Sequence, residues 1–205
     1  MTQPTLHYWY EFASPYSYLS AVRIGDVAKE RGVKVIWRPF LLGGIYKMLK
    51  LPIPPMQLNP MKAEYMWLDC TRQARRHGIP LNKPDHFPQS AVLPARVALI
   101  GLKEGWGEAF SIRVYQANFV HNQLISDARV ISQILAELGQ EPEDVIARAT
   151  TPENKQALMA ETQEAFDKKI FGVPTFFAGD EIFWGDDRLE LALETAVGSQ
   201  NTANS

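Results

Sequence analysis

Ser14 and Pro15 stand where the chain passes from an aromatic stretch into a segment with helical periodicity, within LHYWYEFASPYSYL. Serine before the first helical residue and proline at it are common structural choices, because serine accepts a hydrogen bond from a free amide and proline lacks an N–H. The same helix end carries unpaired amides and partial positive charge, which favour an anion or a thiolate. A hydroxyl can accept from an amide and also donate its proton to a bound sulfur. Ser14 therefore has two compatible interpretations, a helix cap and a sulfur-binding residue.

A second motif, FGVPTFF at residues 171–177, places Pro174 at the start of a short β-type run. A proline in this position either simply begins the strand or follows a cis peptide bond in a tight turn. If the Val173–Pro174 bond is cis, we expect the N–H and C=O of Val173 to point outward. These groups can then pair with an extended peptide, as an added strand does. The sequence leaves both alternatives open.

A third motif, FWGDDRL, places Asp186 and Asp187 at a predicted helix start. Acidic side chains are favourable there, so helix capping is one interpretation. The other is a receptor for an amino acid zwitterion. In that case the helix amides bind the carboxylate, and Asp187 or Asp186 binds the ammonium group.

Other kinds of chemistry find no support in the sequence. Four histidines lack the spacing of metal ligands, so we expect no metal site. The histidines are His7, His77, His86 and His121. Cys70 is the only cysteine, which excludes an intrachain disulfide and a two-cysteine redox centre, and we expect it to be a small buried residue. There is no glycine-rich phosphate loop and no nucleophile-elbow motif.

The composition favours a small-molecule partner. A net charge of −2 and a pI near 6.1 give no general attraction to nucleic acid or anionic lipid. No apolar run approaches the roughly 20 residues of a membrane span, and no basic and then apolar segment opens the chain. We therefore expect a cytoplasmic protein that binds neither nucleic acid nor membrane.

The elements needed to position these motifs can be predicted from periodicity. Residues 6–12 and 33–37 are expected to form strands joined by a helix over 15–31, which implies a parallel pair. Two glycines and four prolines are expected to prevent regular structure across most of residues 39–60. Helices are predicted within 61–77, 89–119, 127–138, 143–149, 152–169 and 186–197, and a hairpin over 173–185.

The predicted fold class is α/β, with a mixed sheet, flanking helices and an inserted helical block. The 205 residues, 46% of them hydrophobic, suffice for one domain or for a small domain with a large insertion. We assign residues 1–58 and 150–198 to the sheet domain, 59–149 to the inserted helical domain and 199–205 to a polar tail.

The motifs FASPYSYL, FGVPTFF and FWGDDRL, in this order, resemble the 2-hydroxychromene-2-carboxylate isomerases. These belong with the kappa-class glutathione transferases and are similar in fold to the disulfide oxidoreductase DsbA. The resemblance runs nearly end to end and includes HGIPL, NQLISDARVI and PMKAEYM. It implies a thioredoxin fold interrupted by a helical domain, usually as a homodimer, with glutathione bound across the thioredoxin part.

The resemblance also assigns residues to the two ends and the middle of glutathione. It implies that Ser14 contacts the sulfur and that the Val173 backbone, before Pro174, pairs with the cysteinyl unit. At the γ-glutamyl end it implies Asp186 and Asp187, with Arg188 as an orienting partner. Lys62 in PMKAEYM resembles a basic residue that meets a glutathione carboxylate. Because the tripeptide offers matching groups for all three motifs, we prefer the functional interpretation of Ser14.

The implied activity is a glutathione-dependent isomerisation in aromatic catabolism, between 2-hydroxychromene-2-carboxylate and trans-o-hydroxybenzylidenepyruvate, through a reversible thiolate adduct. The alternatives are a kappa-class-like transferase acting on small electrophiles and a glutathione-binding protein without turnover. Oxidoreductase relatives carry Cys-x-x-Cys where this chain has Ser14-Pro15-Tyr16-Ser17, so dithiol exchange is excluded.

The aromatic substrate is expected between the two predicted domains. The loop over 43–60, with Tyr16, Tyr65 and Trp67, is a candidate apolar wall, although core packing also explains each of these aromatic residues. One position departs from the family: relatives often carry an asparagine two residues before a Pro-Pro pair, and this chain has Pro52 there. The identity of the aromatic acid therefore stays open.

Overall fold

The computed structural model describes residues 3–51 and 59–202 of the chain, which contain a four-stranded mixed sheet. Its strands are β1 (Thr5–Tyr10), β2 (Lys34–Pro39), β3 (Thr175–Ala178) and β4 (Glu181–Trp184), in the order β2-β1-β3-β4. The β1 strand runs parallel to β2 and antiparallel to β3, which in turn is antiparallel to β4. The predicted parallel pair and the predicted hairpin are confirmed.

The central strand β1 supplies side chains to both faces of the sheet, because successive residues of a strand point to opposite sides. On one face Tyr8 stacks on Tyr10 with ring centroids 5.0 Å apart and on Phe176 at 5.5 Å. On the other face Trp9 meets Phe40 edge to face at 6.0 Å. The sheet therefore lies between two hydrophobic clusters.

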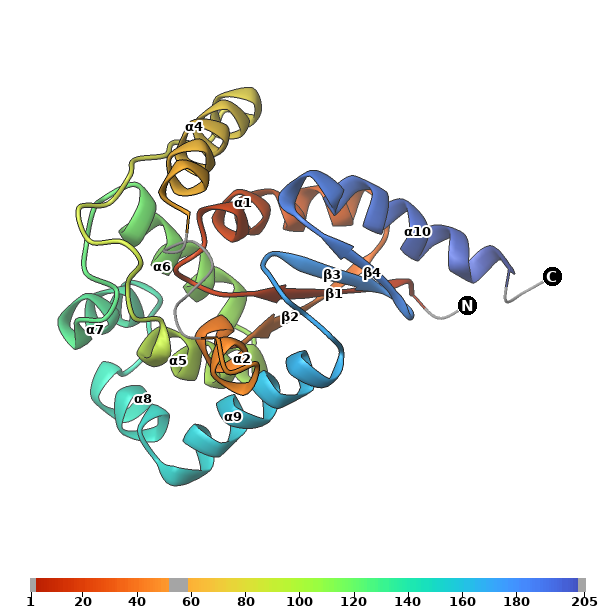
Figure 1. Ribbon diagram of the computed structural model, residues 1–205. Coiled ribbons are helices and arrows are strands. Elements are labelled where there is room, and N and C mark those ends of the chain that lie inside the picture. The colour runs from red at the N-terminus through yellow and green to blue at the C-terminus, as the bar shows by residue number, and fades with distance from the viewer. Residues whose placement is uncertain (1–2, 52–58, 203–205) are drawn as a thin grey trace.

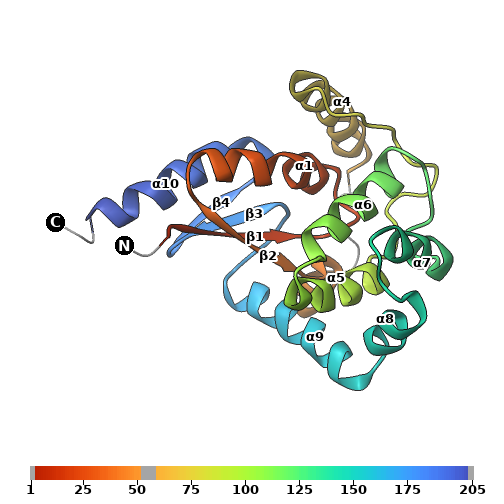
Figure 2. The same ribbon diagram turned by 180° about the vertical axis from the view of Figure 1, so that it is seen from behind.

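Helices cover both faces of the sheet (Figures 1 and 2). The helices α1 (Pro15–Glu30) and α10 (Leu189–Thr202) lie on one face, above the strands in Figure 1. The helices α2 (Leu42–Met48) and α9 (Pro152–Asp167) lie on the other. This arrangement confirms the predicted α/β class.

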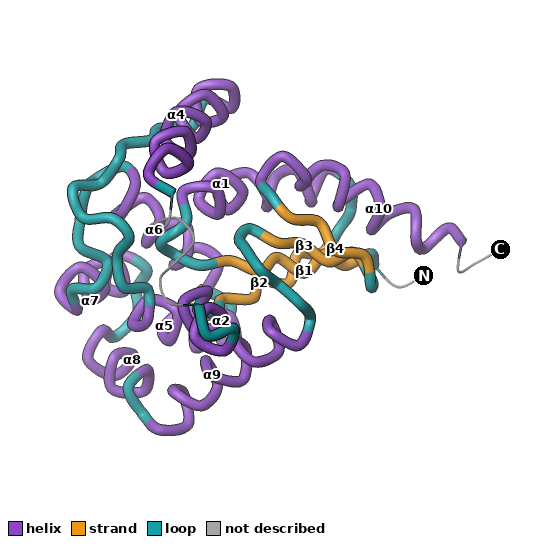
Figure 3. The backbone as a smooth tube through the Cα atoms, viewed as in Figure 1, coloured by secondary structure: helices purple, strands orange, loops and turns teal. Residues whose placement is uncertain are grey.

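The helices of residues 60–149 gather at one end of the sheet, and α4 projects from the body of the molecule (Figure 3). They are α4 (Pro60–His77), α5 (Val92–Glu104), α6 (Gly107–Phe119), α7 (Ala128–Glu137) and α8 (Pro142–Ala149). Tyr115 of α6 packs on Tyr10 and Phe12, so the helical part and the sheet share one hydrophobic cluster. The division at 58 and 150 stays a prediction, and residue 58 lies outside the described residues.

The α2 helix is an element that the sequence did not predict within residues 39–60, although it covers only seven of them and residues 52–58 lie outside the described part of the chain. A Cβ atom at Gly44 would lie 2.8 Å from Thr162 Cγ2, so the absence of a side chain lets α2 pack closely against α9. The Leu41 N–H also donates to Thr162 Oγ1 at 3.2 Å. Tertiary packing thus overrides the low helix propensity of the two glycines.

The C-terminal helical region differs from the prediction at both ends. Residues Asp186–Arg188 form a 3-10 turn before α10 begins at Leu189. The helix then continues through Thr202, four residues into the segment 199–205 that was assigned to a polar tail. Residues 203–205 lie outside the described part of the chain.

Candidate functional site

Ser14 caps α1 as the sequence predicts. Its Oγ accepts a hydrogen bond from the Ser17 N–H at 3.1 Å, and Pro15 is the first residue of the helix. The side chain is partly exposed. Within residues 3–51 and 59–202, no group accepts the Ser14 hydroxyl proton. The hydroxyl can therefore cap the helix and still donate to a ligand.

The first turn of α1 contains no protein thiol. Ser17 is fully buried, and its Oγ has no hydrogen-bond partner among the described residues. Cys70 lies on α4 with no exposed surface, which confirms its predicted burial, and that burial raises the pKa of its thiol to about 12. A nucleophilic sulfur at this helix end must therefore come from a bound molecule.

The Val173–Pro174 peptide bond is cis, which decides between the two alternatives for this proline. Val173 is partly buried, and its N–H and C=O take no part in hydrogen bonds within the described residues. The Pro174 carbonyl, by contrast, accepts from the Gly185 N–H at 2.9 Å. Both backbone groups of Val173 can therefore pair with an added extended peptide.

The two adjacent acids have different environments. The Asp186 carboxylate is 4% exposed, lies 3.0 Å from Arg23 Nη2 and accepts from the Ser20 hydroxyl at 2.7 Å. The Arg23 guanidinium also pairs with Glu190 at 2.6 Å. Asp187 is 63% exposed at its side chain and, among residues 3–51 and 59–202, pairs only with Arg188, at 3.2 Å. Asp186 therefore has a structural role, and Asp187 is the acid that remains accessible to the ammonium group of a ligand.

Lys62 lies on the first turn of α4 and is exposed. It stands seven residues, or about 10 Å along the helix, before Asp69. The Asp69 carboxylate accepts from the Tyr16 hydroxyl at 2.7 Å, which fastens α4 to the first turn of α1. The Lys62 side chain forms no hydrogen bond or ion pair with another described residue.

The three aromatic residues of the predicted substrate wall have separate environments. Tyr16 is partly buried and bonded to Asp69, whereas Trp67 packs edge to face on Phe87 at 4.9 Å. Tyr65 is 57% exposed. The remaining part of the wall and the Pro52 position fall in residues 52–58, outside the described residues.

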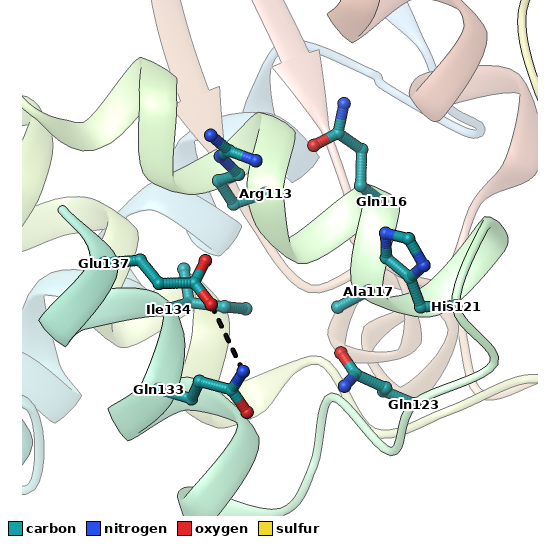
Figure 4. A pocket seen from close by; sticks show the side chains of 8 residues that line it. All are labelled: Arg113, Gln116, Ala117, His121, Gln123, Gln133, Ile134 and Glu137. Carbon is teal, nitrogen blue, oxygen red and sulfur yellow. Dashed lines mark hydrogen bonds between the residues drawn. The ribbon is translucent and has the colours of Figure 1, made fainter.

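A cavity of about 280 Å³ lies between α6 and α7, apart from the predicted site residues (Figure 4). Polar side chains surround its floor of Ala117 and Ile134, and the Gln133 amide donates to Glu137 at 3.2 Å. The polar side chains are Arg113, Gln116, His121, Gln123, Gln133 and Glu137. None of the predicted site residues borders this cavity.

Glu11 is a residue of the candidate site that the sequence analysis missed. It lies three residues before Ser14, and burial raises the pKa of its carboxyl from 4.5 to about 7. The available signal was a single acid within the otherwise uncharged run YWYEFASP. The effect depends on burial, which the residue type alone does not give.

Within residues 3–51 and 59–202, no group of three or more His, Cys, Asp or Glu residues is placed to hold a metal ion. In the same residues, no helix has both the length and the apolar character required to cross a membrane.

A mixed sheet with a capped helix after its first strand and a cis-proline before a later strand defines a protein of the thioredoxin type. Residues 5–196 match the family model described as a DSBA-like thioredoxin domain, and the chain belongs to that family.

Relatives of known name support the resemblance seen in the motifs. The chain is 27% identical to the 2-hydroxychromene-2-carboxylate isomerase of Pseudomonas putida, over 93% of each chain. It is 26% identical to the isomerase of the same name from Sphingobium xenophagum, over 91% of this chain and 95% of the relative. A solved 2-hydroxychromene-2-carboxylate isomerase is similar with a TM-score of 0.86 and 25% identity, covering 98% of this chain and 99% of that one.

Proposed function

We propose that this protein is a glutathione-dependent isomerase that acts on a small aromatic acid such as 2-hydroxychromene-2-carboxylate. The observation that carries the proposal is the free hydroxyl proton of Ser14 at a helix N-terminus that has no cysteine in its first turn. The similarity to isomerases of that name over nearly the whole chain supports the choice of substrate class.

The residues present fit an extended tripeptide with a thiol and a zwitterionic end. Ser14 offers a hydroxyl proton to the sulfur, and Val173 offers an unpaired N–H and C=O to the middle of the peptide. Asp187 offers a surface carboxylate to the ammonium group, with Arg188 holding it from one side. Lys62 supplies an exposed cation for a carboxylate of the ligand.

Bound glutathione would supply a thiolate that adds reversibly to the conjugated carbon of the ring-opened substrate and so permits rotation about a former double bond. The protein's part is to favour the ionised sulfur. Ser14 donates a hydrogen bond to it, and the amides and partial positive charge of the α1 N-terminus lower the pKa of a thiol placed there. Glutathione is not consumed in this scheme.

The test is the ultraviolet absorbance of 2-hydroxychromene-2-carboxylate mixed with the protein, with and without glutathione, while free thiol is titrated in parallel. The proposal predicts interconversion that depends on glutathione and leaves the thiol concentration unchanged. Stoichiometric loss of thiol with small electrophiles, without interconversion, would instead identify a transferase. Binding of glutathione without either reaction would identify a non-catalytic binder.

A further inference from the structure

The main chain of Glu11 is held firmly in the turn between β1 and α1. Its carbonyl accepts from the Ser14 N–H at 3.1 Å and from the Tyr115 hydroxyl at 3.1 Å. The first bond belongs to the turn itself, and the second comes from α6 in the helical part of the molecule. The position from which the Glu11 side chain extends is therefore fixed relative to Ser14.

The Glu11 carboxylate faces the same turn. The backbone of Ala13, the residue next to Ser14 in the chain, favours its ionised form and partly offsets the effect of burial on its pKa. The last residue pair between β1 and β3 is Trp9 with Thr175, so Glu11 follows this pair by two residues and Val173 precedes it by two. Glu11, Ser14 and the Val173 backbone therefore lie at the same end of the sheet.

No cation in residues 3–51 or 59–202 neutralises this carboxylate. Among the described residues it forms no ion pair, and no Lys, Arg or His contributes to the pKa of Glu11. The titratable groups that face it are Tyr46 of α2 and Tyr115 of α6, and their own pKa values are raised, so both stay neutral near pH 7. Residues 52–58 contain no titratable side chain in their sequence.

Glu11 differs in this respect from Glu161, a partly buried carboxylate on α9. Burial also raises the pKa of Glu161, but its carboxylate lies 2.7 Å from Arg38 Nε, which stabilises the charge and opposes that increase. Burial without such a partner raises the pKa of Glu11 to about 7. A group with this pKa exchanges protons readily near neutral pH, as general acid–base catalysis requires.

We propose, on the basis of the function proposed above, that the Glu11 carboxylate accepts the proton of the glutathione thiol when the tripeptide binds. The S–H bond breaks, its electron pair stays on sulfur and the proton moves to a carboxylate oxygen of Glu11. The proton returns by the same path when the thiol re-forms. No oxidant, reductant or further reactant is needed, and Ser14 stabilises the ion that Glu11 helps to create.

The test counts protons and thiolates separately and does not depend on turnover. Glutathione is added to the protein at about pH 7.5, above the pKa of Glu11 and below that of a free thiol. Ultraviolet absorbance gives the thiolate formed, and calorimetry in buffers of different ionisation enthalpy gives the protons released. The wild type should release close to no proton per thiolate formed. Glu11→Gln should release about one proton per thiolate and form at least several-fold less thiolate.

Three controls separate this role from a structural one. Glu11→Asp keeps a carboxylate and should restore a ratio near zero. Glu108→Gln removes a carboxylate on α6 whose pKa is also raised, and should behave as wild type. S-methylglutathione has no thiol proton and should bind wild type and Glu11→Gln equally.

Two results would overturn the proposal, and they differ from each other. Release of one proton per thiolate by the wild type, as by Glu11→Gln, would show that the proton goes to solvent and would leave the proposed isomerase intact. Failure of the wild type to bind glutathione or to form thiolate would contradict the proposed function itself and the role of Glu11 with it.

Discussion

The helices α1 and α9 begin in the same way but lead to different conclusions about function. Ser14-Pro15 opens α1 and Thr151-Pro152 opens α9. The Ser14 Oγ accepts from an amide three residues on at 3.1 Å, and the Thr151 Oγ1 does so at 3.3 Å. Local sequence and local geometry therefore do not distinguish a functional cap from a structural one.

The difference lies in what the fold places beside each helix end. Ser14 follows the Glu11 turn, at the end of the sheet where Val173 and Pro174 lead into β3. The first turn of α9 is instead held to α5, where the Asn154 amide donates to the Arg96 carbonyl at 3.3 Å. A helix cap becomes a candidate site when the topology brings unpaired polar groups to it.

The largest expected effect extends this comparison to the two adjacent acids. Asp186→Ala leaves the Arg23 guanidinium in a largely buried position without its main partner, so we expect a loss of about 3 kcal/mol in the free energy of unfolding. Denaturant unfolding measures it. Asp187→Ala is the matched control and should change the stability by less than about 0.5 kcal/mol while weakening glutathione binding. Equal stability losses in both variants would contradict the distinction.

Removing the two caps in parallel is the next test. Ser14→Ala and Thr151→Ala should each cost about 1 kcal/mol of stability, because each leaves a helix amide unpaired. Only Ser14→Ala should lower the isomerase rate, by roughly 10- to 100-fold, since a hydrogen bond to a charged group is worth about 1.5–3 kcal/mol. Steady-state kinetics with glutathione in excess provides the measurement. An unchanged rate in Ser14→Ala would remove the sulfur-binding role.

Glu11 gives a pH-dependent effect whose sign follows from its pKa. The folded-state pKa of about 7 lies above the ordinary value of 4.5, so the folded protein binds more protons between these values. The wild type should therefore lose stability as the pH rises through this interval. Glu11→Gln does not titrate, and its stability relative to wild type should increase by about 3 kcal/mol between about pH 4 and about pH 8. Denaturant unfolding of both proteins at the two pH values measures this change. An equal stability difference at both pH values would show that the carboxylate is not buried.

The smallest effect concerns the only protein thiol. Cys70→Ala removes a buried sulfur on α4 and should cost roughly 1 kcal/mol of stability without changing the glutathione-dependent rate. Thermal unfolding and the absorbance assay together test this. Loss of activity in a folded Cys70→Ala protein would place a protein sulfur in the reaction.

Features set by local chemistry were accessible from the sequence. The Ser14 cap, the end of α4 at Gly78 with φ of 67° and the turn at Gly179 all depend on neighbouring residues. The α2 helix was missed because it depends on Thr162 of α9, more than a hundred residues away. The structural role of Asp186 was missed for the same reason, since its partner Arg23 is 163 residues away.

The central claim is that the α1 N-terminus holds a cofactor thiol in its ionised form, and the pKa of glutathione bound to the wild-type protein tests it most directly. Ultraviolet absorbance of the thiolate, followed across pH at saturating protein, gives this value. We expect a pKa lower than that of free glutathione by about one unit or more. A bound thiol that titrates as it does in free glutathione would contradict the account.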